Sequence, residues 1–186
     1  MRPIGWCIPL DNKTLTVKDI ALFGMLGALT FGAKFVMSGL PNIEPVSLFI
    51  MVFTVVFGLK ALFPVGIYIA LEILVYGIQL WNINYLYVWP LLALIAWLMH
   101  RVQEPLIWAV VAGSFGLLFG LLCAPVYLFS GGVHFAFSWW LSGIPFDLLH
   151  CAGNFLMVLL LFDPLRKLLT RLYAKMQSKP PAKPEA

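Results

Sequence analysis

Apolar residues run along this chain in long blocks, which short polar or turn-forming stretches separate. A helix needs roughly 17 to 25 mainly apolar residues to cross a hydrocarbon core of about 30 Å. By that measure the pattern predicts six transmembrane helices, at residues 19–37, 45–58, 61–80, 85–100, 105–129 and 144–162. The second block is the shortest, because "PVSLFIMVFTVVFG" rises only about 21 Å as a helix, and a re-entrant segment is the alternative there.

The distribution of basic residues distinguishes these two topologies. With six spans, Lys34 lies on the outer side and the other eleven lysines and arginines lie on the inner side. With a re-entrant second block, the basic residues divide three against nine, and the termini lie on opposite sides. Cytoplasmic segments of membrane proteins carry an excess of Lys and Arg. The pattern therefore favours six spans with both termini cytoplasmic.

Composition agrees with a membrane environment, since 62% of the residues are hydrophobic, 11% are charged and the mean hydropathy is +0.94. A soluble domain has about 25% charged residues. We expect an all-α integral membrane protein, and the net charge of +4 reflects its orientation, not nucleic-acid binding. The expected parts are a cytoplasmic N-terminal segment, a six-helix domain, an amphipathic cytoplasmic helix and a disordered tail, at residues 1–18, 19–162, 163–176 and 177–186.

Motifs of soluble catalysis are missing from the sequence. There is no Walker A loop, no H-E-x-x-H and no G-x-S-x-G, and the three cysteines lack C-x-x-C spacing. Each of these motifs supplies a defined phosphate, metal or nucleophile chemistry. We therefore expect neither an enzyme nor a resident metal or cofactor.

Polar side chains recur on one face of the third predicted span, where Tyr68, Glu72, Tyr76 and Gln79 follow a helical period. A charge at the bilayer centre costs about 2.5 to 3.5 kcal/mol on insertion scales, so it normally faces a partner or a wet cavity. Glu72 therefore pairs with Lys34 at the outer end of the first span, contacts a ligand, or does both.

A second polar stripe lies on the sixth span, where Asp147, His150, Cys151 and Asn154 share one face. Ser142, Gly143 and Pro145 are typical of a helix start. Asp147 then either caps the first turn or contacts a ligand. His150 forms a helix-to-helix hydrogen bond or contacts a ligand, and Asn154 is too deep for a capping role.

Three outer connections are expected at residues 38–45, 79–89 and 130–143, and they combine aromatic rings with amides or turn residues. Rings at this depth form an aromatic belt in many membrane proteins. Amides among the rings instead favour a small-molecule pocket, which uses apolar walls and a few placed polar groups. The candidate ligand residues outside the two stripes are Asn42, Glu44, Trp81, Asn82, Asn84, Tyr85, His134 and Trp139.

The first span differs from the others, because Gly24, Ala28 and Gly32 recur every four residues. Small residues at this spacing let another helix approach closely. The stripe serves either internal packing or docking of a partner.

Over residues 18–170 the chain resembles the S components of energy-coupling factor (ECF) transporters. The resemblance rests on "GMLGALTFG", on "LPNIEPVSLFIMVFTVVFGLKALFPVG" and on "GIPFDLLHCAGNF". It implies a six-helix, multi-pass protein of a prokaryotic cell membrane that captures a vitamin on the outer side. It also implies a coupling transmembrane protein and two ATPase subunits as partners, with Gly24, Ala28 and Gly32 at the position of the family's alanine-x-x-x-alanine contact motif.

Substrate choice in this family resides in a few residues, and the chain is most similar to the cobalamin-type S components. Another vitamin, pantothenate or tryptophan is the alternative cargo, with Lys34 meeting a ligand carboxylate. A small channel and an intramembrane enzyme are alternatives from other classes. The fourth and fifth spans carry almost no polar side chains, which disfavours a pore through one chain.

Overall fold

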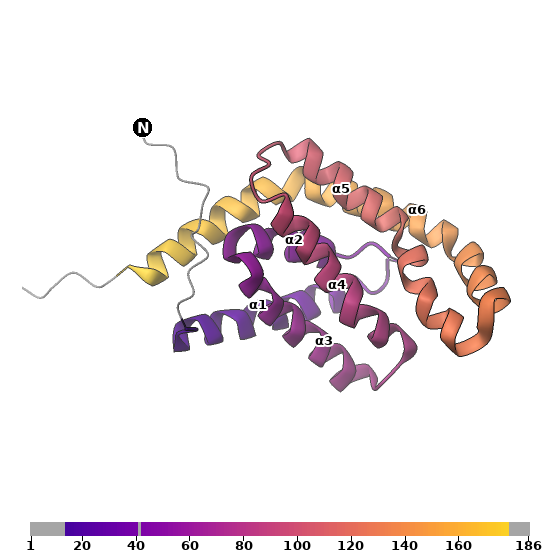
Figure 1. The fold of residues 1–186 in the computed structure, drawn as a ribbon. Coiled ribbons are helices and arrows are strands. Elements are labelled where there is room, and N and C mark those ends of the chain that lie inside the picture. The colour runs from indigo at the N-terminus through magenta and orange to yellow at the C-terminus, as the bar shows by residue number, and fades with distance from the viewer. Residues whose placement is uncertain (1–13, 41, 179–186) are drawn as a thin grey trace, which may run out of the picture.

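A computed structural model describes residues 14–40 and 42–178, and these residues are helical with short turns between the helices. The expected segments at 1–18 and 177–186 fall mostly outside the described residues. Figure 1 shows the helices and their order. They are α1 (Val17–Val36), α2 (Val46–Phe57), the short 3-10 helix η1 (Gly58–Ala61), α3 (Leu62–Tyr76), α4 (Leu80–Leu98), α5 (Pro105–Leu117) and α6 (Phe119–Gln177).

Four helical stretches of the described chain are long and apolar enough to cross a membrane. They are Val17–Val36, Val46–Tyr76, Leu80–Leu98 and Pro105–Gln177. This finding confirms the prediction of an all-helical protein whose apolar helices are long enough to cross a membrane.

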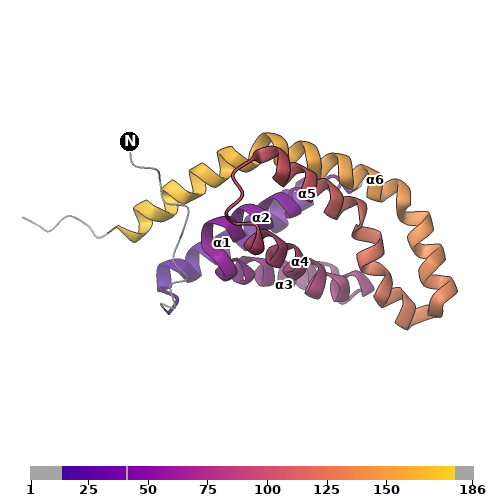
Figure 2. The same ribbon diagram turned by 45° about the horizontal axis from the view of Figure 1, so that its top comes forward.

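Two glycines turn the chain inside the longer stretches. Gly58 has a φ of 62° and ends α2, after which η1 leads into α3. Gly132 has a φ of 79° and divides α6. In Figures 1 and 2 the chain reverses in this region, so that the later part of α6 returns beside α5. Glycine adopts such positive φ values without the clash that a Cβ causes.

Other glycines let helices approach closely. A Cβ on Gly27 of α1 would lie 2.7 Å from Ile67 of α3, and a Cβ on Gly116 of α5 would lie 2.8 Å from the carbonyl of His150 in α6. Such contacts are too short for any other residue without a backbone shift. Larger rings fill the remaining core, where Trp108 of α5 stacks on Phe162 of α6 with ring centroids 4.7 Å apart.

Two of the expected outer connections are much shorter than predicted. Residues 79–89 are helical from Leu80 onward, because Gln79 and Asn82 form a capping box that starts α4 immediately after α3 has ended at Gly77. Residues 130–143 are helical apart from the turn at Gly132.

The expected helix start at residues 142–145 is also wrong, since Pro145 lies inside α6. α6 likewise continues through Pro164 to Gln177, so residues 163–176 extend it and do not form a separate helix. Asp163 pairs with Arg166 and Lys167 one turn later, a local pairing that is equally compatible with a helix interior.

Candidate functional site

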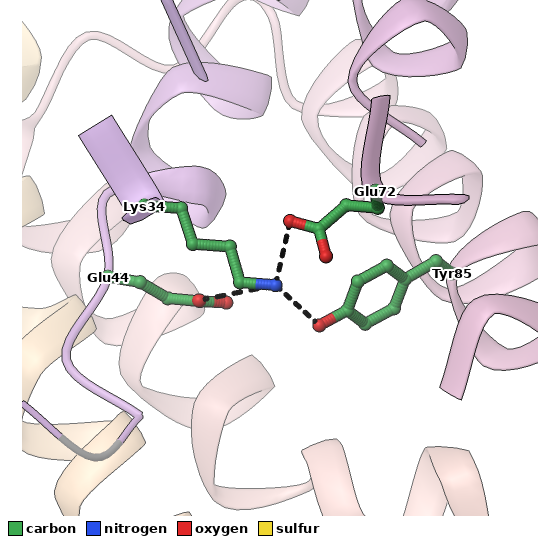
Figure 3. Close-up of polar contacts among 4 residues, drawn as sticks. All are labelled: Lys34, Glu44, Glu72 and Tyr85. Atoms are coloured by element: carbon green, nitrogen blue, oxygen red, sulfur yellow. Dashed lines mark hydrogen bonds and ion pairs between the residues drawn. The ribbon is translucent and has the colours of Figure 1, made fainter. Parts of the chain in front are cut away.

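A charged cluster lies where the ends of α1, α3 and α4 meet (Figure 3). The Nζ atom of Lys34 donates to Oε1 of Glu72 and to the hydroxyl of Tyr85, each at 3.0 Å. Glu72 is 1% exposed, whereas the Lys34 side chain is 20% exposed. The structure therefore confirms the ion pair that the sequence offered as a partner for Glu72.

Glu44 lies at the edge of this cluster, in the connection between α1 and α2. Its Oε2 atom is 3.9 Å from the Nζ atom of Lys34, which is beyond hydrogen-bond distance. Burial raises the pKa of the Glu44 carboxyl, the nearby ammonium of Lys34 opposes that shift, and the carboxylate of Glu72 adds to it. An ammonium has three N–H donors, so Lys34 retains one for Glu44 or for a ligand acceptor.

Local sequence explains how the cluster assembles. Lys34 lies in the last turn of α1, where the carbonyl end of the helix favours a cation. Glu72 and Tyr68 are one helical turn apart on the buried face of α3. Tyr85 comes from α4, and its ring lies 4.9 Å from the ammonium of Lys34, which adds a cation–π contact.

The polar stripe of α6 is buried against α2, α5 and the start of α6 itself. Oδ1 of Asp147 accepts the backbone N–H of Gly120 at 3.1 Å. The amide of Asn154 donates to Ser47 Oγ at 3.1 Å and to the carbonyl of Ala112 at 3.3 Å. Asp147 therefore does accept a free N–H at a helix start, as expected. The helix start is that of α6 at Phe119, however, and not one in the turn that contains Asp147.

His150 differs from its neighbours in the stripe. It is 2% exposed, and both ring nitrogens lack a hydrogen-bond partner among the described residues, as do Oδ2 of Asp147 and Oδ1 of Asn154. The helix-to-helix hydrogen bond expected for His150 is thus not formed. An unpaired buried polar atom costs about 1 to 3 kcal/mol, so these atoms favour the presence of a polar ligand or water.

A row of aromatic rings joins the charged cluster to this stripe. Ring centroids are 5.3 Å apart for Tyr85 and Trp89, 5.4 Å for Trp89 and Phe119, and 4.8 Å for Phe119 and His150. Trp89 is fully buried, and its Nε1–H lacks a hydrogen-bond partner among the described residues. We name the set Lys34, Glu44, Glu72, Tyr85, Trp89, Phe119, Asp147 and His150 the polar–aromatic belt.

The remaining candidates are more dispersed. Oδ1 of Asn82 caps α4 by accepting the N–H of Gln79 at 2.6 Å, and Oδ1 of Asn84 accepts the hydroxyl of Tyr87 at 3.0 Å. Trp139 stacks on Tyr127, with ring centroids 3.8 Å apart. Both asparagines therefore have local structural roles.

Four further candidates lie near the surface. Tyr76 and Trp81 are 41% and 40% exposed, His134 is exposed on α6, and Asn42 is half-buried in the connection before α2. The ring of Tyr76 lies beside that of Phe31 of α1. These four residues therefore lie outside the polar–aromatic belt.

The small-residue stripe of α1 is not used for packing within the described chain. Ala28 is exposed, and a Cβ added to Gly24 or to Gly32 would meet no atom within 4 Å. The close approach of α1 to α3 instead uses Gly27. The stripe is therefore open to a partner helix.

Trp89 and Phe119 were not among the residues selected from the sequence as ligand contacts.

The described residues contain no group of three or more His, Cys, Asp or Glu side chains that is suited to hold a metal ion. Comparison with protein-family models, with curated proteins and with solved structures gave no match.

Proposed function

We propose that this chain is the substrate-capturing S component of an ECF-type importer in a prokaryotic cell membrane. In this proposal it binds a vitamin on the outer side and delivers it inward with a coupling transmembrane protein and two ATPase subunits. The polar–aromatic belt carries the proposal. It combines a partly exposed carboxylate and ammonium with deeper rings and unpaired polar atoms, and such a combination suits an amphipathic organic ligand.

The topology that we propose has six spans and two cytoplasmic termini. The turns at Gly58–Ala61 and at Gly132 divide two of the long apolar stretches in two, which supports six crossings. The excess of basic residues on one side supports the orientation. Lys34 and the belt then lie toward the outer side.

Cobalamin is the first ligand to test, because it offers both extensive apolar surface and many hydrogen-bonding groups. A small carboxylate such as pantothenate or tryptophan is less well matched. Lys34 already donates to Glu72 and Tyr85, so it offers a ligand carboxylate a single remaining N–H donor, for which Glu44 competes. The other polar atoms proposed to meet a ligand are the acceptors of Glu44 and Asp147 and the donor of Trp89.

A thermal-stability screen of the detergent-purified protein against vitamins and their precursors tests this function. A ligand that binds only the folded state at 100 times its Kd adds about 2.7 kcal/mol of stability. We expect one compound to raise the Tm of the wild type and to raise that of Trp89→Phe much less, because this variant keeps a ring and removes the N–H. Leu74→Ala is the matched control, since Leu74 is 79% exposed on α3. If no vitamin changes the Tm, the S-component function is contradicted.

The open stripe on α1 is the proposed contact with the coupling protein. Ala28→Trp should prevent assembly with a coupling module while leaving ligand binding intact, because a large ring blocks close helix approach. Leu74→Trp controls for an added ring on an exposed face elsewhere. Normal assembly of Ala28→Trp would remove the docking role from this stripe.

A further inference from the structure

An apolar groove of about 350 Å³ lies between α1 and the C-terminal part of α6, with α2 at its base. We name it the α1–α6 groove. Its lining includes Leu22 and Leu29 of α1, Phe49 of α2, and Leu165, Leu172 and Met176 of α6. Figures 1 and 2 show the beginning of α1 and the end of α6 at the same end of the molecule. The rim is open, since Leu29 and Leu172 are 53% and 55% exposed.

The groove is long and apolar. Its lining runs from Leu165 to Met176 along α6, a rise of about 16 Å at 1.5 Å per residue. Apart from the hydroxyl of Tyr173, the side chains that line this length are apolar, which suits a hydrocarbon chain.

One end of the groove is polar and cationic. The Nζ atom of Lys18 donates to the carbonyl of Met176 at 3.2 Å, and Met176 lines the groove. Oδ1 of Asp19 accepts the hydroxyl of Tyr173 at 3.2 Å and the amide of Gln177 at 3.0 Å. Its other oxygen, Oδ2, accepts from Thr16, so hydrogen bonds within the protein already occupy this carboxylate.

Lys18 supplies the positive charge at this end. It is exposed, and its ammonium has further N–H donors to offer. The N-terminus of α1 adds the positive end of its helix dipole. Basic residues at the membrane surface attract anionic lipid headgroups.

We propose that the α1–α6 groove binds one acyl chain of an anionic phospholipid, whose headgroup phosphate is held by Lys18. The polar end of the groove matches the headgroup, and the apolar length from Leu172 to Leu29 matches the chain. This inference rests on the groove and its charges, and it does not depend on the cargo or the partners proposed above.

Native mass spectrometry of the delipidated protein tests the proposal. The protein is incubated with equal amounts of phosphatidylglycerol and phosphatidylcholine that carry the same acyl chains. We expect the wild type to retain one phosphatidylglycerol with at least tenfold preference. Lys18→Gln should lose that preference, and Lys167→Gln is the matched control, because Lys167 pairs with Asp163 and its side chain is 59% exposed.

A second pair of variants tests the groove itself. Leu29→Trp should fill the groove and reduce retention of both lipids, whereas Ile20→Trp adds a ring on α1 at a position that does not line the groove. Met25→Trp, at a groove position that is 64% exposed, replaces Leu29→Trp if that variant unfolds. Equal retention of the two lipids by the wild type would overturn the headgroup assignment. Unchanged retention in both tryptophan variants of the groove would overturn the site. Loss of coupling-module assembly in those variants with unchanged lipid retention would assign the groove to a protein partner.

Discussion

Replacing Lys34 with Met should leave Glu72 buried and without its cationic partner. At 3.0 Å and an effective dielectric constant of about 20, the attraction between two unit charges is about 5.5 kcal/mol. The Lys34 side chain is 20% exposed, so solvent screens part of this attraction and the net loss is smaller. Breaking a buried pair by removing one partner typically costs about 3 to 5 kcal/mol, and we expect a loss near the lower end of that range.

The assay is reversible unfolding of the detergent-purified protein, compared for Lys34→Met, Glu72→Met and the double variant. A loss of about 3 kcal/mol lowers the Tm by roughly 6 to 12 °C for a chain of this size. The double variant should recover most of that loss, because an apolar pair of similar volume removes the unpaired charge. If Lys34→Met costs less than about 1 kcal/mol, or if the two single losses simply add, the buried-pair interpretation is refuted.

Three further changes test other contacts. Gly116→Ala should lower stability by about 1 to 3 kcal/mol, because its Cβ would lie 2.8 Å from a carbonyl of α6, whereas Gly143→Ala has open space and should be neutral or slightly stabilising. Asp147→Leu should cost about 1 to 3 kcal/mol by leaving the N–H of Gly120 unpaired, while Asp147→Asn keeps an acceptor and should cost less. Burial raises the pKa of the Glu44 carboxyl above its usual 4.5, so the folded state binds more protons than the unfolded state. The Tm of the wild type should therefore fall relative to that of Glu44→Gln as the pH rises above 4.5.

Each of these comparisons has a contradicting result that a melting curve reveals. Equal effects of alanine at Gly116 and Gly143 would contradict the close approach of α5 to α6. Equal losses for Asp147→Leu and Asp147→Asn would show that the Gly120 contact contributes nothing. Parallel pH profiles for the wild type and Glu44→Gln would contradict the raised pKa of Glu44.

The helical class and the Lys34–Glu72 pair were predictable because each depends on few residues. Long apolar blocks specify helices wherever the solvent is lipid, since backbone groups must be paired within the segment. Lys34 and Glu72 are charges in the first and third apolar blocks, at depths that the spans determine. A buried charge requires a partner, and few other groups were within reach.

The start of α4 was missed because amides lower the hydropathy of residues 79–89. The signal was nevertheless present, since Gln79 and Asn82 have the spacing of a capping box. The turn at Gly132 lies inside the connection that was predicted at residues 130–143, but that connection was predicted too long, because the residues after Gly132 already belong to the helix.

The partner of Asp147 and the position of Trp89 could not be predicted from local sequence. A carboxylate in a helix can reach any free N–H that packing brings near it, and Gly120 is 27 residues away. Aromatic residues of α4 occur on both its buried and its exposed faces, so sequence alone does not show which ring faces the core. Both features depend on how α4, α5 and α6 pack together.

The part of α6 that follows Gly132 connects the two ligand sites that we propose. It contains about 45 residues, so it extends for about 68 Å along its axis, well beyond the 40 to 45 Å of a whole bilayer. The same helix carries His150 and Asp147 at one level and the lining of the α1–α6 groove at another. If occupancy of either level changes its tilt, each ligand alters the affinity of the other by the same factor. A lipid bound near Met176 would then act as an effector of capture at the outer side, and the captured molecule would act in turn on the lipid.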